Sequence, residues 1–134
     1  MSQSRNHPIP PIIPERGFTL LELLVALVII SVLTATALPE YRRFRQQAFD
    51  NRALTDLRTV ALGEEAYFLE NEKYFSCRNE TCATLPGVNR ISEGTDVVVE
   101  GSDEGWTGEA KHPRGTGRVW RWDSSRGGLE FDRD

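Results

Sequence analysis

One acidic side chain stands inside the most apolar part of this sequence. Between Phe18 and Leu38, Glu22 is the only charged residue. An ionised acid at the centre of a membrane-spanning helix costs about 2.5 to 3.5 kcal/mol on insertion scales. Such a cost indicates a role, and the chemistry open to the carboxylate is to pair with a cation where water is excluded. The competing interpretation places Glu22 near the positive N-terminal end of a helix, which is worth under about 1 kcal/mol.

The side chains that could form a catalytic set do not match a known one. The histidines are His7 and His112, and the conceivable companions of His112 are Asp123 and Ser124, which form no recognised nucleophile motif. The segments "GTG" and "RGG" lie between expected strands and do not open a helix, so they are not phosphate-binding loops. We therefore expect a protein that is not an enzyme and uses no cofactor.

Arginines surround two tryptophans in the segment "HPRGTGRVWRWDSSRGG". Cations beside stacking aromatic rings can hold the backbone and bases of DNA. The candidate DNA-binding residues are Arg114, Arg118, Trp120, Arg121, Trp122 and Arg126. The formal net charge of -4 argues against this function. Tryptophans that belong to a protein core would also leave the arginines merely solvated, so DNA binding is the weaker interpretation.

The length of the apolar run suits a membrane-spanning helix. At 1.5 Å per residue, the about 21 residues from Phe18 to Leu38 make a helix roughly 31 Å long, which crosses a bilayer core once. A secretory signal peptide would have a shorter apolar stretch of about 7 to 15 residues. The prolines in residues 1–16 exclude a regular helix before the run. We expect a retained anchor.

An amphipathic helix is expected directly after the anchor. Apolar residues recur there at three- and four-residue spacing, so one face should pack and the other should be solvated. These residues are Tyr41, Phe44, Ala48, Leu54, Leu57, Ala61 and Phe68. Pro39 stands at the junction, where it should kink one continuous helix or separate two. The helical pattern ends at about Asn71.

Beyond Asn71 the sequence predicts a small sheet. Turn residues separate short apolar groups, and short links between successive strands favour an antiparallel meander. The expected strands are Thr95 to Glu100, Trp106 to His112 and Gly117 to Asp123, and Gly128 to Asp132 could add a short edge strand. Alternation along the third strand points Trp120 and Trp122 to one face, which we expect to cover the helix. About 60 head residues form a marginal core alone, so they need that helix.

The stretch "RGFTLLELLVALVIISVLTATALPEY", Arg16 to Tyr41, resembles the N-terminal signature of type IV pilins and the related pseudopilins. In that family a basic leader ends in glycine, a prepilin peptidase cuts after it, and the new N-terminal phenylalanine is methylated. A glutamate is fifth in the mature chain, and a proline often follows about 22 residues into it. The matching residues here are Gly17, Phe18, Glu22 and Pro39.

The resemblance implies an α+β, pilin-like fold with four parts. Residues 1–17 would be the leader, which is removed, and residues 18–38 the transmembrane and assembly half of a long kinked helix. Residues 39–71 would be the amphipathic half of that helix, packed on a β-rich head formed by residues 72–134. Cleavage would create a free amino group at Phe18, beside the same apolar layer that contains Glu22. In the family this glutamate is thought to meet the amine of an adjacent subunit, but pairing within one chain is also open at this spacing.

The resemblance also implies on which side of the membrane the head lies. Counting basic residues alone would put the head in the cytoplasm, because Arg42, Arg43 and Arg45 follow the anchor. The prepilin peptidase works at the cytoplasmic face, however, so Gly17 must lie there and the head in the periplasm.

Cys77 and Cys82 fit an oxidising periplasm. They enclose "RNET" and can close a small loop, which contributes roughly 2 kcal/mol on the loop-entropy model. Two unpaired thiols are the alternative. A metal site is less consistent with the sequence, because one cysteine pair without a nearby histidine falls short of four ligands.

The implied function is structural. The chain would polymerise through its N-terminal helix into a type IV pilus that serves motility, adhesion or DNA uptake. The alternatives are a pseudopilin of a type II secretion system and a DNA- or surface-binding minor pilin. The implied partners are the prepilin peptidase and N-methyltransferase, other pilin subunits, and an inner-membrane assembly platform with a motor ATPase. The subunit would cross the inner membrane once before it joins an extracellular pilus or a periplasmic pseudopilus.

Overall fold

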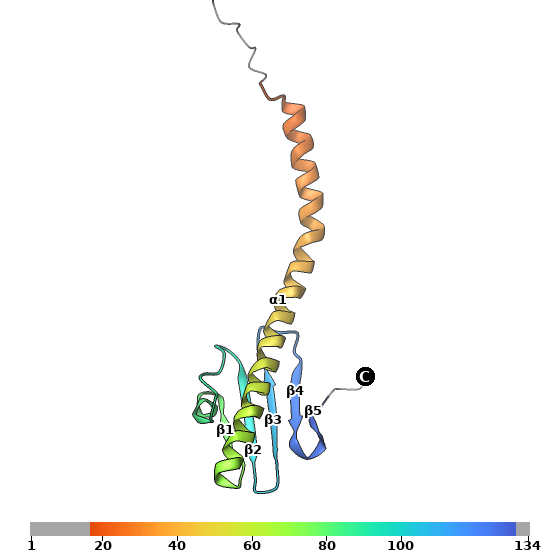
Figure 1. The fold of residues 1–134 in the computed structure, drawn as a ribbon. Helices are drawn as coiled ribbons and strands as arrows, with labels where there is room; N and C mark the ends of the chain where they lie inside the picture. The colour runs from red at the N-terminus through yellow and green to blue at the C-terminus, as the bar shows by residue number, and fades with distance from the viewer. Residues whose placement is uncertain (1–16, 131–134) are drawn as a thin grey trace, which may run out of the picture. The chain divides into compact units, whose positions relative to one another are not determined.

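A computed structural model describes residues 17–130 of the chain. The chain divides into two compact units, Met1–Ala37 and Leu38–Asp134. One helix, α1 (Leu20–Asn71), begins in the first unit and ends in the second (Figure 1). It runs through Pro39 without a break, so the proline does not separate two helices, and a bend at this position stays a prediction. The end at Asn71 agrees with the sequence pattern.

The part of α1 in the first unit satisfies its own polar groups. The hydroxyls of Ser31 and Thr34 each donate to the carbonyl four residues earlier at 2.7 Å, and Thr36 donates to the carbonyl of Leu33 at 3.0 Å. Backbone and hydroxyl groups bonded within one helix need no water, which is the condition for crossing a bilayer core. The helix is long enough and apolar enough to do so.

The second unit contains one five-stranded antiparallel sheet. The strands follow one another in the order β1-β2-β3-β4-β5, which confirms the predicted meander. Their bounds are β1 (Cys77–Arg78), β2 (Asp96–Gly101), β3 (Trp106–Lys111), β4 (Val119–Asp123) and β5 (Gly128–Glu130). In Figure 1 the C-terminal half of α1 crosses one face of this sheet. The α+β pilin-like architecture is therefore confirmed.

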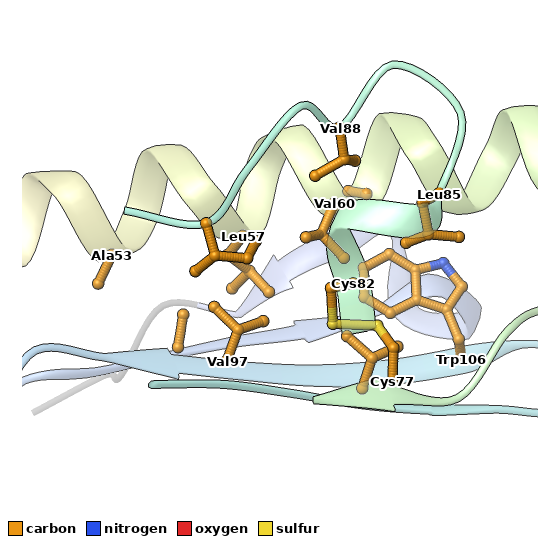
Figure 2. Packing of buried hydrophobic residues seen from close by; sticks show 13 residues of the cluster. Ala53, Leu57, Val60, Cys77, Cys82, Leu85, Val88, Val97 and Trp106 are labelled. Atoms are coloured by element: carbon orange, nitrogen blue, oxygen red, sulfur yellow. A yellow bond between two sulfur atoms is a disulfide. The ribbon is translucent and has the colours of Figure 1, made fainter. Parts of the chain in front are cut away.

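The core lies between α1 and the sheet. Leu57 and Val60 of the helix and Val97 of β2 are fully buried and point toward one another (Figure 2). Trp106 fills the space beside them because the next inward position of β3 is Gly108. A Cβ there would lie 2.8 Å from the Trp106 ring and 3.2 Å from Leu57. The sheet thus completes its core with the helix, as its small size requires.

The tryptophans of β4 face the helix, as predicted. Trp120 donates its indole N–H to the backbone carbonyl of Asp50 at 2.9 Å. Trp122 stacks on Trp106, with ring centroids 5.7 Å apart. Both are half-buried against the core. This confirms the alternation along the strand.

The predicted packing face of the helix is wrong in part. Tyr41, Phe44 and Ala48 are exposed, and Leu54 is only half-buried. The buried face has the members Phe49, Asp50, Ala53, Asp56, Leu57, Val60, Ala61, Gly63 and Glu64. The spacing is helical as expected, but three acids belong to the buried stripe. The reason is that each of them accepts hydrogen bonds from a loop of the head.

Between α1 and β2 the chain forms a disulfide-closed loop. Cys77 and Cys82 are bonded, which confirms the predicted pair. The bond joins β1 to the 3-10 helix η1 (Asn79–Thr84), and both sulfurs lie in the core beside Val60 and Val97 (Figure 2). A second short 3-10 helix, η2 (Ser124–Arg126), links β4 to β5.

Candidate assembly site and the carboxylates that hold the head

The predicted cleavage point lies in exposed, non-helical backbone. Gly17, Phe18 and Thr19 precede the first residue of α1, and the Phe18 side chain is 85% exposed. An exposed segment outside regular structure is where a peptidase can bind a chain in an extended form. The other residues of the predicted leader, 1–16, lie outside the described residues.

Glu22 belongs to the first turn of α1, and its carboxylate is available for an external partner. Its backbone N–H donates to the hydroxyl of Thr19 at 3.2 Å, so Thr19 caps the helix. The Thr-x-x-Glu spacing is that of a capping box, and the acid also lies at the positive end of the helix. Among residues 17–130, none forms a hydrogen bond or ion pair with the Glu22 carboxylate. Within this part of the chain the carboxylate therefore has no cation bound to it.

The apolar side chains around Glu22 form a continuous uncovered surface. Every residue from Leu20 to Ala48 is exposed, including Leu20 at 88% and Leu33 at 62%. Soluble monomers rarely expose apolar patches of more than a few hundred Å². This helix surface therefore requires lipid or other protein chains around it.

On the head side, Asp50 fixes the β3–β4 loop to the helix. Its two carboxylate oxygens accept the backbone N–H of Thr116 at 3.1 and 3.2 Å, and one also accepts the Thr116 hydroxyl at 2.7 Å. Gly115 permits this approach, because a Cβ there would collide with the Asp50 carboxylate. Asp50 is 5% exposed, so its charge is stabilised by these donors and not by water.

Asp56 and Glu64 bind two further segments in the same way. Asp56 accepts the backbone N–H of Ser92 at 3.2 Å and its hydroxyl at 3.0 Å. Glu64 accepts the backbone N–H of Phe75 at 2.8 Å, while its second oxygen is buried without a partner in the described residues. Three loops of the head are thus held by three carboxylates of one helix.

Burial shifts the ionisation of Glu64. Its side chain is fully buried, and the loss of water raises its pKa above the ordinary 4.5 despite the hydrogen bond from Phe75. The neighbouring Glu65 raises the pKa further. A carboxyl whose pKa is higher in the folded state binds its proton more tightly there. The folded state is therefore favoured at low pH, and this contribution is lost as the pH rises from about 4.5 through the folded pKa.

Glu64→Gln should remove that part of the pH dependence. We expect the free energy of unfolding of the wild type to fall, relative to Glu64→Gln, as the pH is raised from about 4.5, because only the wild type must desolvate a charge. Urea titrations of the full chain in detergent at a series of pH values measure the difference. Glu70→Gln, which removes an exposed acid of the same helix, is the matched control. If the difference in the free energy of unfolding between the wild type and Glu64→Gln did not change with pH, the raised pKa of Glu64 would be contradicted.

The sequence carries a signal that Asp50 and Glu64 belong to the buried face of the helix. Asp50, Leu57 and Glu64 are spaced seven residues apart, and Ala53 and Val60 fill the intervening positions of the same stripe. Seven-residue spacing keeps side chains on one helix face. The acids at both ends of an apolar stripe therefore mark a buried face whose ends contact polar loops.

The candidate DNA-binding residues divide between separate places. Arg121 pairs with Glu109 at 2.9 Å, and Arg126 lies 3.4 Å from Asp123 and 3.5 Å from Glu130. Arg118 lies over the Trp120 ring at 5.0 Å, and Arg114 over the ring of Phe49. The two tryptophans face the helix and are half-buried there. DNA binding through this set stays a prediction.

The conceivable catalytic companions are also apart. His112 is buried, stacks on Phe49 at 4.4 Å and accepts the backbone N–H of Arg114. The strand register puts Asp123 opposite Thr107, at the other end of β3, where it caps η2. Within residues 17–130, no group of three or more His, Cys, Asp or Glu side chains could hold a metal ion.

Comparisons with known proteins match the N-terminal half best. A family model described as the prokaryotic N-terminal methylation motif matches residues 14–38. The type IV major pilin protein of Myxococcus xanthus is 34% identical over 66 residues, which are 49% of this chain and 30% of that protein. The type II secretion system core protein G of Escherichia coli is 35% identical over 60 residues, 45% of this chain and 41% of that protein. This chain spans less than half the length of either relative.

One relative is matched over most of both chains. The type IV wide pilus major component of Thermus thermophilus is 30% identical over 106 residues, 78% of each chain. This chain belongs to the type IV pilin family. A match of that length extends beyond α1, so the pilin shares more than the N-terminal motif with that relative. The relatives named here are pilus or secretion components and not enzymes.

Proposed function

We propose that this pilin is a structural subunit of a type IV pilus and has no enzymatic activity. The observation that carries the proposal is the uncovered apolar helix from Leu20 to Leu38, whose one carboxylate has no partner among the described residues. In a membrane this surface contacts lipid, and in a filament it packs against the same surface of other subunits. One helix thus serves as the anchor of the monomer and the core of the polymer.

Processing and location follow from the same helix. The prepilin peptidase cuts between Gly17 and Phe18 and methylates the new amine, leaving residues 18–134 as the mature chain. The first half of α1 spans the inner membrane and residues 72–134 form a periplasmic head. The disulfide in that head suits this oxidising compartment. An assembly platform and a motor ATPase supply the energy for extraction, and the filament ends outside the cell.

A pseudopilin is the second candidate function. The similarity to core protein G of type II secretion systems favours it. The shared N-terminal motif serves both assemblies, and the difference lies in whether the filament leaves the cell or stays in the periplasm. Filaments sheared from the cell surface would favour the pilus, and filaments found only in the periplasm the pseudopilus.

Gly17→Leu tests processing directly. We expect the precursor to accumulate with its leader and no filaments to form, because the peptidase of this family requires glycine before the cut. The substitution should not disturb the fold, since a Cβ at Gly17 meets no atom within 4 Å. The intact masses of chains from the membrane and from sheared filaments show whether residues 1–17 have been removed. Filaments built from wild-type chains that keep residues 1–17 would refute the proposed processing.

A further inference from the structure

Three arginines gather around one buried ring in the second unit. The guanidinium carbons of Arg114, Arg52 and Arg45 lie 4.7, 5.3 and 6.0 Å from the centroid of the Phe49 ring. Phe49 is 8% exposed, and its ring is also stacked on that of His112. We call Arg45, Arg52 and Arg114 the Phe49 arginine cluster. Two of its members come from α1 and one from the β3–β4 loop.

The charge of this cluster is not neutralised by an ion pair among residues 17–130. All three arginines are exposed, and none of them forms an ion pair with any residue of 17–130. The nearby Asp50 carboxylate is already bound by Thr116. Like charges held this close repel one another, and an anion placed between them removes that repulsion. Guanidinium groups present paired N–H donors that fit carboxylates and phosphates.

Unpaired carboxylates lie at the opposite end of the same unit. Tyr74 donates its backbone N–H to the carbonyl of Ser102 at 3.0 Å, which joins the segment after α1 to the β2–β3 turn. Figure 1 shows this turn and the end of α1 at the same end of the strands, with the β3–β4 loop at the opposite end. The exposed acids here are Glu72, Asp103 and Glu104, which we call the acidic tip. Lys73 lies beside these three acids, so the negative charges of the acidic tip outnumber this positive charge.

We propose that the Phe49 arginine cluster of one copy binds the acidic tip of another copy of this chain. The proposal rests on the filament function proposed above and names a contact between heads in that filament. Cluster and tip are about 33 Å apart along α1 at 1.5 Å per residue, so one copy cannot pair them internally. A contact between different surfaces of identical chains is heterologous, and where its rotation does not close it builds an open helical filament.

Charge substitutions at the tip test the contact without touching the core. We expect Glu104→Lys to lower the yield of sheared filaments by at least about tenfold, because a lysine would face three arginines. Glu80→Lys makes the same change of charge at an exposed position of η1 and should leave the yield unchanged. Combining Glu104→Lys with Arg114→Glu should restore filaments. Retention of the Cys77–Cys82 bond in each variant checks the fold of the head.

Disulfide crosslinking tests the proximity itself. The described residues contain no free cysteine, so a chain with Arg114→Cys and Glu104→Cys adds one reactive thiol at each end. Mild oxidation of cells should give a ladder of covalent dimers, trimers and larger species. The control pairs Arg114→Cys with Thr107→Cys, which lies exposed on the other face of the sheet, and should give no ladder.

Each outcome supports or overturns the contact. If Glu104→Lys gave filaments at the wild-type yield and the double-cysteine chain gave no ladder, the contact would be overturned. The proposed filament function would then remain intact. Loss of filaments from Arg114→Glu alone, with Glu104→Lys normal, would show that the cluster binds phosphate of lipid or DNA instead and would also overturn it. Absence of filaments from the wild type, in cells that assemble another pilin, would refute the filament function and this contact together.

Discussion

Cells that produce Glu22→Ala should contain the processed chain in their membrane and no filaments. The substitution removes the only charge of the apolar run, so insertion becomes easier and cleavage after Gly17 is unaffected. In the filament, however, the amine of Phe18 would remain in an apolar layer without its carboxylate. An unpaired buried charge costs about 3 to 5 kcal/mol, enough to stop addition of subunits. Immunoblots of the sheared and membrane fractions, with intact masses, measure both steps.

Two further variants separate pairing from helix capping. Glu22→Gln keeps the size and the backbone N–H bonded to Thr19 but has no charge, so it should fail as Glu22→Ala does. Glu40→Ala removes an exposed acid whose nearest cation, Arg43, is 3.9 Å away, and should assemble normally. Filament yield equal to the wild type from Glu22→Ala would refute a role in assembly.

The sheet was predictable because its signals are local. Period-two alternation in β2 puts Val97 and Val99 in the core and Val98 on the outer face, and glycines punctuate the links. β3 alternates buried and exposed at every position. Only β1 gave no signal, since two residues are too short to show a period. Its place next to β2 depends on the disulfide and on pairing of Cys77 with Val99, which is remote in sequence.

The phase of the helix was harder to predict than its existence. Apolar residues at helical spacing gave the element and its end at Asn71, but Tyr41 and Phe44 lie before the head begins to cover α1 and stay exposed. Meanwhile Asp50 and Glu64 are buried, because loops far along the chain bring N–H donors to them. Thr116 is remote from Asp50 in the sequence, so the residues around Asp50 do not predict this hydrogen-bond donor.

The assembly site shows the converse case. Glu22 could be singled out from the residues alone, because an acid in an apolar run is a conflict that the sequence itself shows, whereas Gly17 and Phe18 follow from the resemblance to the pilin signature. Their partners could not, because the described chain leaves the Glu22 carboxylate and the surrounding apolar surface uncovered. Of the three arginines around Phe49, only Arg114 belongs to the predicted DNA-binding set with the tryptophans of β4. Only the fold shows that Arg114 meets Arg45 and Arg52 of the helix.

Asp50→Ala should destabilise the head by about 2 to 4 kcal/mol, because it removes a buried carboxylate that accepts hydrogen bonds from the backbone N–H and the hydroxyl of Thr116. The β3–β4 loop would then separate from α1, and water would reach Trp120, which bonds the Asp50 carbonyl. Denaturant unfolding of the full chain, followed by tryptophan fluorescence, gives the free energy of unfolding and should show a lower midpoint.

The controls assign that loss to the hydrogen bonds between Asp50 and Thr116. Asp103→Ala removes an exposed acid of the β2–β3 turn and should change stability by under about 0.5 kcal/mol. Thr116→Val removes only the hydroxyl donor, so its cost should be smaller than that of Asp50→Ala, because the backbone N–H of residue 116 still donates. The double variant should cost less than the sum of the two, since both remove the same bond. Strict additivity, or an Asp50→Ala midpoint equal to that of the wild type, would show that the head is held to the helix by its apolar core alone.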